Sequence, residues 1–189
     1  EDGVLPFIGD PNPDFVMNYT NTFEYKGLSL GFAINHTSGG DIYSTTTATL
    51  MGRGLTTDTE NRLSTYILPG VNINTGLPND IQINNSNFYF DNGFASPADE
   101  LSVYDGSVVR LREVNIAYSL PSKLLNKTPF GKVTIKASAF NMWYNAYNTP
   151  DGVNFDPNTT GLGAGNGQGF EFLTGPSSKR YGMSVNLSF

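Results

Sequence analysis

The chain has no cysteine and only one histidine, His36. Without cysteine, neither a disulfide framework nor a thiolate metal site is available, and one histidine excludes metal sites built on several imidazoles. Charged residues make up only 15% of the chain, and Asp and Glu outnumber Lys and Arg by 17 to 11, which gives a net charge of −6. This balance leaves no basic stripe for neutralising phosphates, so the sequence predicts no nucleic-acid partner.

Long apolar runs are also missing. No stretch approaches the roughly 18 apolar residues of a membrane-spanning helix, although alternating barrel strands would escape this test. No basic segment followed by an apolar core opens the chain, so we expect no signal peptide within it. Glycine is abundant, with 21 residues among the 189, and asparagine is frequent. Such a turn-rich, weakly charged composition favours β-structure over helix.

The clearest pattern in the sequence is the final stretch, residues 180–189. Every second residue there is apolar and the residues between are small or polar, which predicts a strand with one apolar and one polar face. Its apolar positions are Tyr181, Met183, Val185, Leu187 and Phe189. A sandwich strand alternates too. A complete amphipathic strand that ends directly on an aromatic residue resembles the terminal strand of an outer-membrane barrel, where strands run about 9–11 residues.

The same period of two predicts four more strands, at residues 15–25, 28–37, 108–120 and 132–144. Lys26 and Gly27 form a tight hairpin turn between the first two. Residues 45–50 are expected either to continue the second strand or to form a β-rich excursion. Arg110 and Arg112 share the parity of the apolar face, so we expect them at the level of lipid headgroups, where long cations snorkel.

The connections alternate between short and long, and the long ones cover residues 38–107 and 145–179. An up-and-down membrane barrel has this arrangement, with short periplasmic turns and long extracellular loops. Five strands cannot close a barrel, because the smallest such barrels need about eight. An open sheet would leave two unpaired edges in hydrocarbon. The sequence therefore predicts an all-β chain that forms the C-terminal part of a larger protein.

Six segments, in order, resemble the C-terminal end of the SusC/RagA-type TonB-dependent transporters of Bacteroidota outer membranes. They are residues 8–14 (IGDPNPD), 20–28 (TNTFEYKGL), 39–43 (GGDIY), 109–121 (VRLREVNIAYSLP), 138–143 (SAFNMW) and 155–157 (FDP), followed by the final strand. Asn158 departs from the pattern, since the family more often has an acidic residue after Asp-Pro. The match is weak across residues 52–101. The family's plug domain and TonB box have no counterpart in this chain.

The resemblance implies a barrel of about 22 strands, of which this chain forms the last five. It also implies an active importer in the cell outer membrane that takes up oligosaccharides or oligopeptides. Such importers work with a SusD-like surface lipoprotein, draw energy from TonB–ExbB–ExbD and need the barrel assembly machinery. The family has no enzymatic activity, and no catalytic residue, metal site or cofactor is expected in this chain.

Candidate site residues fall into three groups. Substrate contacts are expected from aromatic and acidic residues where the fourth strand meets its outer loop: Trp143, Tyr144, Tyr147, Asp151 and Asp156. Lipid contacts, including aromatic girdles at the membrane surfaces, are expected from Phe15, Tyr25, Phe32 and Tyr118. The terminal strand, from Tyr181 to Phe189, is the expected assembly signal. Asp151, Asn154, Asp156 and Asn158 carry oxygen ligands, but their spacing does not match a calcium loop.

Two other functions remain open from the residues alone. A secreted β-sandwich that binds a ligand or mediates adhesion through its long loops would show the same alternation. A barrel with a structural or secretion-related role is the third reading. What covers the apolar faces of the strands, lipid or a second sheet, distinguishes the sandwich from the barrels.

Overall fold

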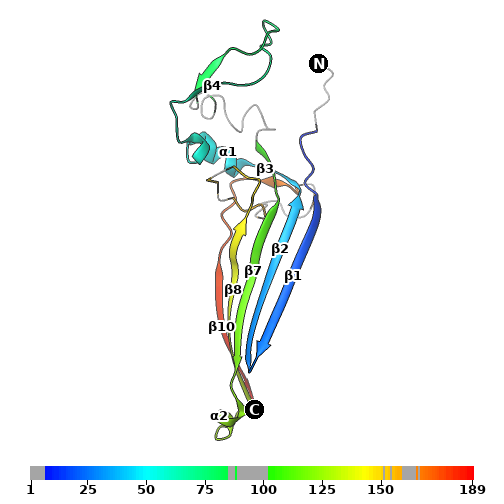
Figure 1. Cartoon of the computed structure of the whole chain (residues 1–189), viewed down its shortest axis with the longest axis vertical. Coiled ribbons are helices and arrows are strands. Elements are labelled where there is room, and N and C mark those ends of the chain that lie inside the picture. Colours follow the sequence, from blue (N-terminus) through cyan, green and yellow to red (C-terminus); the bar gives the residue numbers. More distant parts are fainter. Residues whose placement is uncertain are drawn as a thin grey trace. The chain divides into compact units, whose positions relative to one another are not determined.

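The computed structural model describes residues 7–84, 88, 102–150, 152–153, 155–158, 165 and 167–189. Their fold divides into two units, each assembled from three segments of the chain. One unit contains residues 13–39, 107–147 and 176–189 and forms a single long sheet, and the other contains residues 1–12, 40–106 and 148–175 (Figure 1). We call them the sheet unit and the loop unit. No helix in the described residues is long and apolar enough to span a membrane.

The sheet unit is one antiparallel sheet whose strands follow the chain in the order β1-β2-β7-β8-β10. The strands are β1 (Pro13–Tyr25), β2 (Leu28–Gly39), β7 (Val108–Ser119), β8 (Lys132–Asn145) and β10 (Arg180–Ser188). They agree with the ranges expected from the sequence to within two residues at each end, because period-two alternation marks a strand with one apolar face. The prediction of an all-β chain is confirmed.

Two short connections join neighbouring strands of the sheet unit. Lys26 and Gly27 both have positive φ, at 49° and 85°, as a two-residue type I′ hairpin requires. Glycine takes this conformation without strain, which explains its place as the second turn residue. The connection between β7 and β8 contains the short helix α2 (Ser122–Leu125), and the Leu120 N–H closes it by donating to the Val133 carbonyl, 2.9 Å away.

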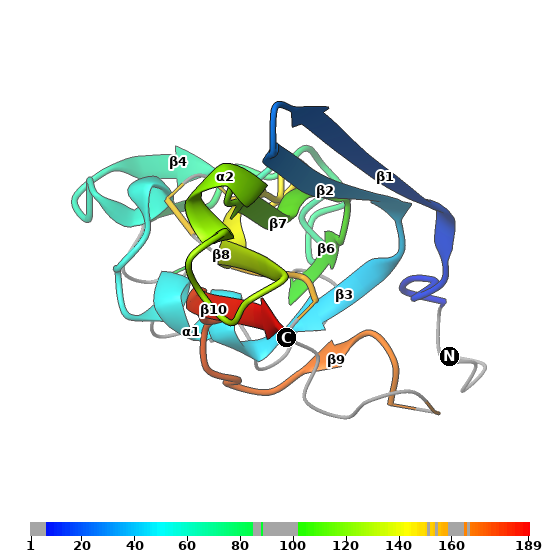
Figure 2. The same cartoon turned by 90° about the horizontal axis from the view of Figure 1, so that it is seen from below.

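The loop unit contains a three-stranded sheet in the order β6-β3-β9, with β3 (Asp41–Ser44) between β6 (Val103–Asp105) and β9 (Phe170–Glu171) (Figure 2). β3 runs antiparallel to β6 and parallel to β9. The unit also holds β4 (Thr65–Ile67) paired with β5 (Gln82–Asn84), the helix α1 (Thr45–Gly52) and the 3₁₀ turn η1 (Thr57–Thr59). A small apolar cluster forms its core: Ile42, Val153 and Phe155, with Leu50 against them.

The expectation that residues 45–50 continue a strand or form a β-rich excursion is wrong, because they form α1. The Ser44 hydroxyl caps this helix by accepting from the Thr47 N–H at 3.1 Å. The carboxylate of Glu171, which is fully buried, accepts hydrogen bonds from the Ser44 hydroxyl and from the Thr46 N–H, both at 3.0 Å. This capping, supplied by residues close and distant in sequence, stabilises a helix in a threonine-rich segment that propensity alone disfavours.

Candidate functional site

The two faces of the five-stranded sheet differ in chemistry along most of its length, with Asn21 on the apolar parity of β1 and Phe140 on the polar parity of β8 as exceptions. The register aligns small and polar residues on one face, which we call the polar face: Asn18, Thr20, Thr22 and Glu24 on β1; Ser29, Gly31, Ala33 and Asn35 on β2; Glu113, Asn115, Ala117 and Ser119 on β7; Thr134, Lys136 and Ser138 on β8; and Gly182, Ser184 and Asn186 on β10. Hydrogen bonds join neighbouring strands there, as between Asn35 Nδ2 and Asn18 Oδ1 at 2.9 Å. The polar face is therefore hydrophilic, and its side chains are ordered by these contacts.

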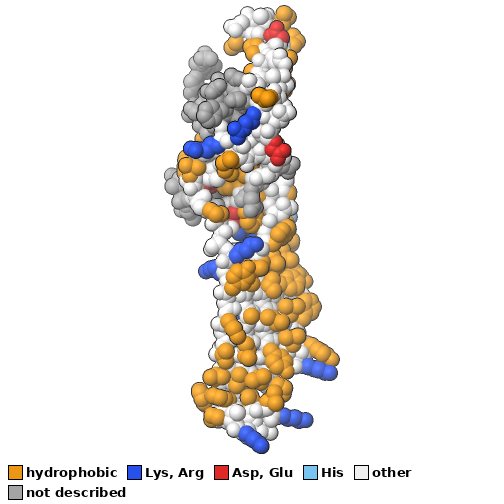
Figure 3. Space-filling view, turned by 90° about the vertical axis from the view of Figure 1, so that its left-hand side faces the viewer, with side chains coloured by type: hydrophobic (Ala, Val, Ile, Leu, Met, Phe, Trp, Pro, Cys, Tyr) orange, Lys and Arg blue, Asp and Glu red, His pale blue; other side chains and the backbone are white. Residues whose placement is uncertain are grey.

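The opposite, apolar face presents Phe15, Met17, Tyr19, Phe23, Tyr25, Leu28, Leu30, Phe32, Ile34, Val114, Ile116, Tyr118, Val133, Ile135, Ala137, Ala139, Tyr181, Met183, Val185 and Leu187. Figure 3 shows hydrophobic side chains gathered over the strands of this sheet, with lysine and arginine side chains near its ends. Many are exposed, among them Met183 at 76% and Val185 at 53%. An apolar area of this extent on a single sheet indicates a non-aqueous or protein partner.

The four residues expected to face lipid all lie on the apolar face. Tyr25 and Tyr118 both sit opposite Leu28, at the hairpin end of the sheet. Phe15 lies near the other end, with its ring 5.3 Å from that of His36. Phe32 lies in the middle of β2 instead, where its ring is 5.9 Å from that of Tyr19. The positions of Phe15, Tyr25 and Tyr118 suit girdles at two rims, and that of Phe32 suits the band between them.

Irregular pairing in the upper half of the sheet redirects two arginine side chains. β7 contains one extra residue, Arg112, relative to β2, because Glu113 pairs with Ala33 while Leu111 pairs with the next residue, Ile34. Beyond this bulge the parity of β7 reverses, and Arg110 pairs with the polar-face residue Asn35. The expectation that Arg110 and Arg112 share the parity of the apolar face is therefore wrong, and their level relative to lipid headgroups stays a prediction. The alternation along one strand does not reveal an extra residue, because a bulge is defined by the pairing with the neighbouring strand.

A second irregularity lies beside the first on β8. Leu111 and Glu113 are two residues apart on β7, whereas their partners on β8, Trp143 and Phe140, are three residues apart. Asn141, at this point, has a positive φ of 53°, and its side chain donates to the Ser178 carbonyl at 3.2 Å. Asparagine tolerates this left-handed conformation better than most residues. The two bulges together interrupt the regular pleat at one level of the sheet.

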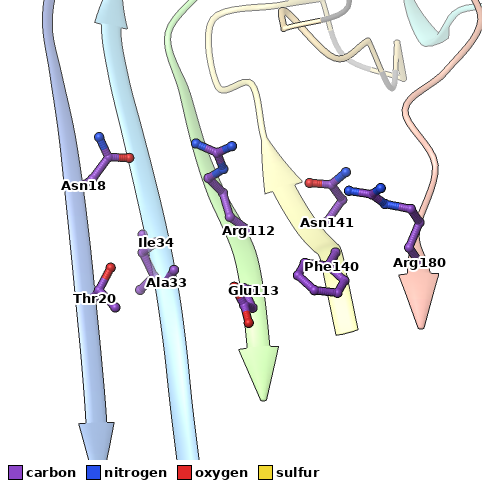
Figure 4. A pocket seen from close by; sticks show the side chains of 9 residues that line it. All are labelled: Asn18, Thr20, Ala33, Ile34, Arg112, Glu113, Phe140, Asn141 and Arg180. Atoms are coloured by element: carbon purple, nitrogen blue, oxygen red, sulfur yellow. The ribbon is translucent and has the colours of Figure 1, made fainter. Parts of the chain in front are cut away.

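At this level the polar face has a hollow of about 440 Å³ (Figure 4). All five strands contribute to its lining: Asn18, Thr20, Ala33, Ile34, Arg112, Glu113, Phe140, Asn141 and Arg180. Phe140 is a large aromatic side chain on the polar parity of β8, and the Arg180 guanidinium lies over its ring, 5.5 Å from the centroid. The hollow thus combines two cationic groups, one carboxylate, two amides and an aromatic ring.

The three aromatic residues expected to contact substrate do not lie together on one face. Trp143 pairs with Leu111, which pairs with Ile34, so it lies on the apolar face, where it is 52% exposed. Tyr144 pairs with Arg110 on the polar face, and the Arg110 guanidinium lies 5.5 Å from its ring centroid. Register therefore leaves Tyr144 on the polar face and Trp143 on the apolar face.

Tyr147 lies beyond the end of β8, where its hydroxyl is 3.1 Å from Nε2 of His36. His36 pairs with Met17 of the apolar face, so this contact lies at the margin of that face. This position suits packing at the rim of the sheet better than a substrate contact.

The two acidic candidates belong to the loop unit. Asp156 is buried, at 3% exposure, and its Oδ1 accepts from the Asn158 N–H at 3.1 Å, which is the turn chemistry typical of aspartate. Asp151 and Asn154 lie outside the described residues. Among the residues that are described, no three His, Asp or Glu side chains are grouped closely enough to hold a metal ion.

Sequence reasoning missed the residues that line the hollow, above all Arg112, Phe140 and Arg180. One signal was available, since Arg112 and Glu113 are adjacent charged residues within a strand. Two neighbouring strand residues normally point to opposite faces, so they share a polar face only where a bulge inserts an extra residue.

Comparison with known proteins gives relatives of one kind. The chain is 26% identical over 183 residues to TonB-dependent receptor P3 of Formosa agariphila, a match that covers 96% of this chain and 17% of the receptor. It is 25% identical over 203 residues to TonB-dependent receptor P26 of the same organism, covering 100% of this chain and 18% of that receptor. The chain resembles part of a SusC/RagA-like TonB-dependent transporter. No model of a protein family matches it.

Solved structures support the fold of this transporter type. The RagAB peptide importer in the "closed-closed" state superposes with a TM-score of 0.63 at 18% identity, over 97% of this chain and 18% of the importer chain. The "open-open" state gives a TM-score of 0.53 at 20% identity, over 94% of this chain and 17% of the importer chain. The resemblance to SusC/RagA-like TonB-dependent transporters predicted from the sequence is confirmed. The chain spans less than a fifth of the length of these relatives.

Proposed function

We propose that this chain is the C-terminal wall of a TonB-dependent outer-membrane importer. The observation that carries the proposal is the five-stranded sheet, with an extensive and largely exposed apolar face on one side and a polar face on the other. Lipid is the partner that suits the apolar face, because barrel strands alternate between lipid-facing and lumen-facing residues. The polar face would then line the lumen through which a cargo passes.

The edges of the sheet support a larger barrel. Within the described residues, β1 pairs only with β2, and β10 pairs only with β8. Unpaired backbone groups on these edges would be costly in hydrocarbon, so each edge needs another strand. In a barrel of about 22 strands, the rest of the protein supplies both neighbours.

Strand length also suits a membrane. β10 has 9 residues, which at about 3.3 Å per residue span about 30 Å. A tilt of about 40° reduces this span to about 23 Å along the membrane normal, close to the apolar band of about 25 Å in such barrels. The terminal strand is therefore long enough to cross the outer membrane once.

The connections assign a direction to the barrel. Residues 38–107 and 145–179 would form extracellular loops, and residues 121–131 and the C-terminus would lie in the periplasm, where turns are short. A SusD-like lipoprotein would be the partner on the outside. TonB–ExbB–ExbD would act through parts of the importer other than these strands. The cargo would be an oligosaccharide or an oligopeptide.

The terminal strand would serve a second purpose during assembly. Tyr181, Met183, Val185 and Leu187 present one apolar parity on β10, whose outer edge is unpaired within the described sheet. The barrel assembly machinery would capture this edge by β-addition, with main-chain hydrogen bonds supplying affinity. Deleting Phe189 should therefore lower the amount of assembled protein in the outer membrane more than it lowers the stability of protein that has already folded.

Membrane fractionation of the full-length protein tests the proposal. The importer is expected in the outer-membrane fraction, with a gel mobility that changes on heating, and a strain lacking it should lose uptake of one class of labelled oligosaccharide or oligopeptide. Recovery of the full-length protein as a secreted molecule with no heat-dependent mobility would overturn the proposal and favour a binding or adhesion sandwich.

A further inference from the structure

The hollow on the polar face contains cationic groups without matching anionic partners. Within the described part of the chain, no hydrogen bond or ion pair engages the Arg112 guanidinium. The Arg180 guanidinium contacts the Phe140 ring, which holds the side chain without neutralising its charge. Two of the three charged groups in the lining are thus positive and available to a ligand.

The one carboxylate in the lining has another contact. Glu113 Oε1 accepts a hydrogen bond from Asn115 Nδ2 at 3.2 Å. Figure 4 shows the Glu113 side chain directed toward the opposite end of the hollow from the Arg112 guanidinium, with Asn141 between Arg112 and Arg180. The end of the hollow with both arginines is therefore positively charged.

Building this arrangement requires two departures from a regular sheet. Arg112 reaches the polar face only because it is the extra residue of β7, and Asn141 stands at the irregular point of β8 in a left-handed conformation. Bulges commonly redirect side chains next to functional sites, and backbone conformations of this kind are rare for residues other than glycine. A sheet face that is only hydrated needs neither of these two irregularities.

We propose that the hollow binds a carboxylate, held between the guanidinium groups of Arg112 and Arg180. A planar guanidinium offers paired N–H donors that match the two oxygens of a carboxylate, and such charge-assisted hydrogen bonds are among the strongest in proteins. The amides of Asn18 and Asn141 add polar contacts at the same level. The carboxylate comes from the cargo or from an acidic residue elsewhere in the full-length protein. The cargo source rests on the importer function proposed above.

The test uses the purified full-length protein and four defined pools of ligand. The first two are oligopeptides without Asp or Glu, with either a free or an amidated C-terminus. The other two are oligosaccharides with or without a uronic acid. Mass spectrometry measures what the protein retains. Arg112→Gln and Arg180→Gln each remove one charge, and Lys136→Gln is the matched control, because Lys136 lies on the polar face opposite Ala117 and Ser184 and does not line the hollow.

A cargo carboxylate predicts that the wild-type protein retains the carboxylated pool of one ligand class over its neutral counterpart. Each arginine variant should reduce this retention by about ten- to a hundredfold, which is the effect of one hydrogen bond to a charged group. Lys136→Gln should lose little, and Arg112→Lys, which keeps the charge but not the paired N–H donors, should lose an intermediate amount. A carboxylate from within the protein predicts a lower thermal midpoint for both arginine variants, and not for Lys136→Gln, with unchanged cargo preference.

Two results would overturn the inference. In the first, the arginine variants and Lys136→Gln behave alike in both retention and thermal midpoint. In the second, amidated or neutral ligands are retained as well as carboxylated ones and the midpoints are unchanged. In that second case the importer function stands, since cargo is still bound. Retention of no ligand by the wild type, with unchanged midpoints, would count against both.

Discussion

Lysine substitutions at two adjacent positions of β10 test the proposal that the apolar face of the sheet contacts lipid and the polar face lines the lumen. Val185 lies on the apolar face opposite Ile135, and Asn186 lies on the polar face opposite Thr134. Val185 is one residue from the midpoint of β10, which is about 3 Å along the strand and well inside an apolar band of about 25 Å. A lysine there would place its ammonium group near the bilayer midplane.

The expected cost of Val185→Lys is about 2–4 kcal/mol, the range for lysine near the midplane of a membrane barrel. This cost changes the folding equilibrium by roughly 30-fold to almost a thousandfold. Leu187→Lys should cost less, because Leu187 lies nearer the end of the strand, where depth-dependent costs fall to about 0–1 kcal/mol. Asn186→Lys is the matched control and should cost little, because its side chain enters a polar, hydrated environment.

The assay measures urea unfolding of the full-length protein in lipid vesicles, with the heat-modifiable gel band reporting the folded fraction. We expect the midpoint to fall for Val185→Lys, to fall less for Leu187→Lys and to stay close to wild type for Asn186→Lys. Equal shifts at Val185 and Asn186 would refute the assignment of the two faces. A cost that is larger at Leu187 than at Val185 would refute the placement of β10 in the bilayer.

Three further predictions concern other parts of the chain. Burial raises the pKa of Glu171, the hydrogen bonds from Thr174 and Thr46 lower it, and the net effect is a lowered pKa. The ionised Glu171 carboxylate therefore stabilises the folded loop unit above the unfolded pKa of about 4.3, and this stabilisation is lost as the pH falls through the lower pKa of the folded state. The amide protection factors of α1, which are corrected for the slower intrinsic exchange in acid, should fall as the pH is lowered, and Glu171→Gln should remove most of that pH dependence. Gly31→Ala should destabilise by about 1 kcal/mol, since its Cβ would lie 2.8 Å from Asn115 Nδ2, whereas Gly182→Ala has open space and should be neutral or slightly stabilising in the same urea assay. Protease added to intact cells should cut within residues 38–107 or 145–179 and spare residues 121–131, and cleavage of the latter would reverse the topology.

The sequence predicts the sheet well because each strand carries its own evidence. Alternation along β1, β2, β7, β8 and β10 is a local pattern, and it specifies both the strand and the face that each residue occupies. The Lys26-Gly27 turn is equally local, since its conformation depends on these two residues. Agreement between pattern and structure is therefore closest where neighbouring residues determine the outcome.

The features that sequence reasoning missed depend on contacts between distant segments. α1 is stabilised partly by Glu171, which is 125 residues away from Thr46 along the chain. The bulge at Arg112 becomes visible only when the pairing with β2 is known, and it reverses the assignment of Arg110. The position of Trp143 follows from the same shifted register. Alternation in the sequence does not show where a residue is inserted. The face that each residue occupies beyond a bulge can therefore be assigned only from the pairing with the neighbouring strand.

The way in which the loop unit is assembled has a consequence for evolution and engineering. Its three-stranded sheet takes β3 and β6 from residues 40–106 and β9 from residues 148–175, and the buried Glu171 of the second segment accepts from Ser44 and Thr46 of the first. Replacing only residues 40–106 with those of a related protein would leave the buried Glu171 carboxylate without its hydrogen-bond donors. Replacing only residues 148–175 would remove the carboxylate that accepts from the first turn of α1. The two segments therefore form one structural unit that is inherited together. We expect chimaeras that exchange both segments to fold, and chimaeras that exchange only one segment not to fold.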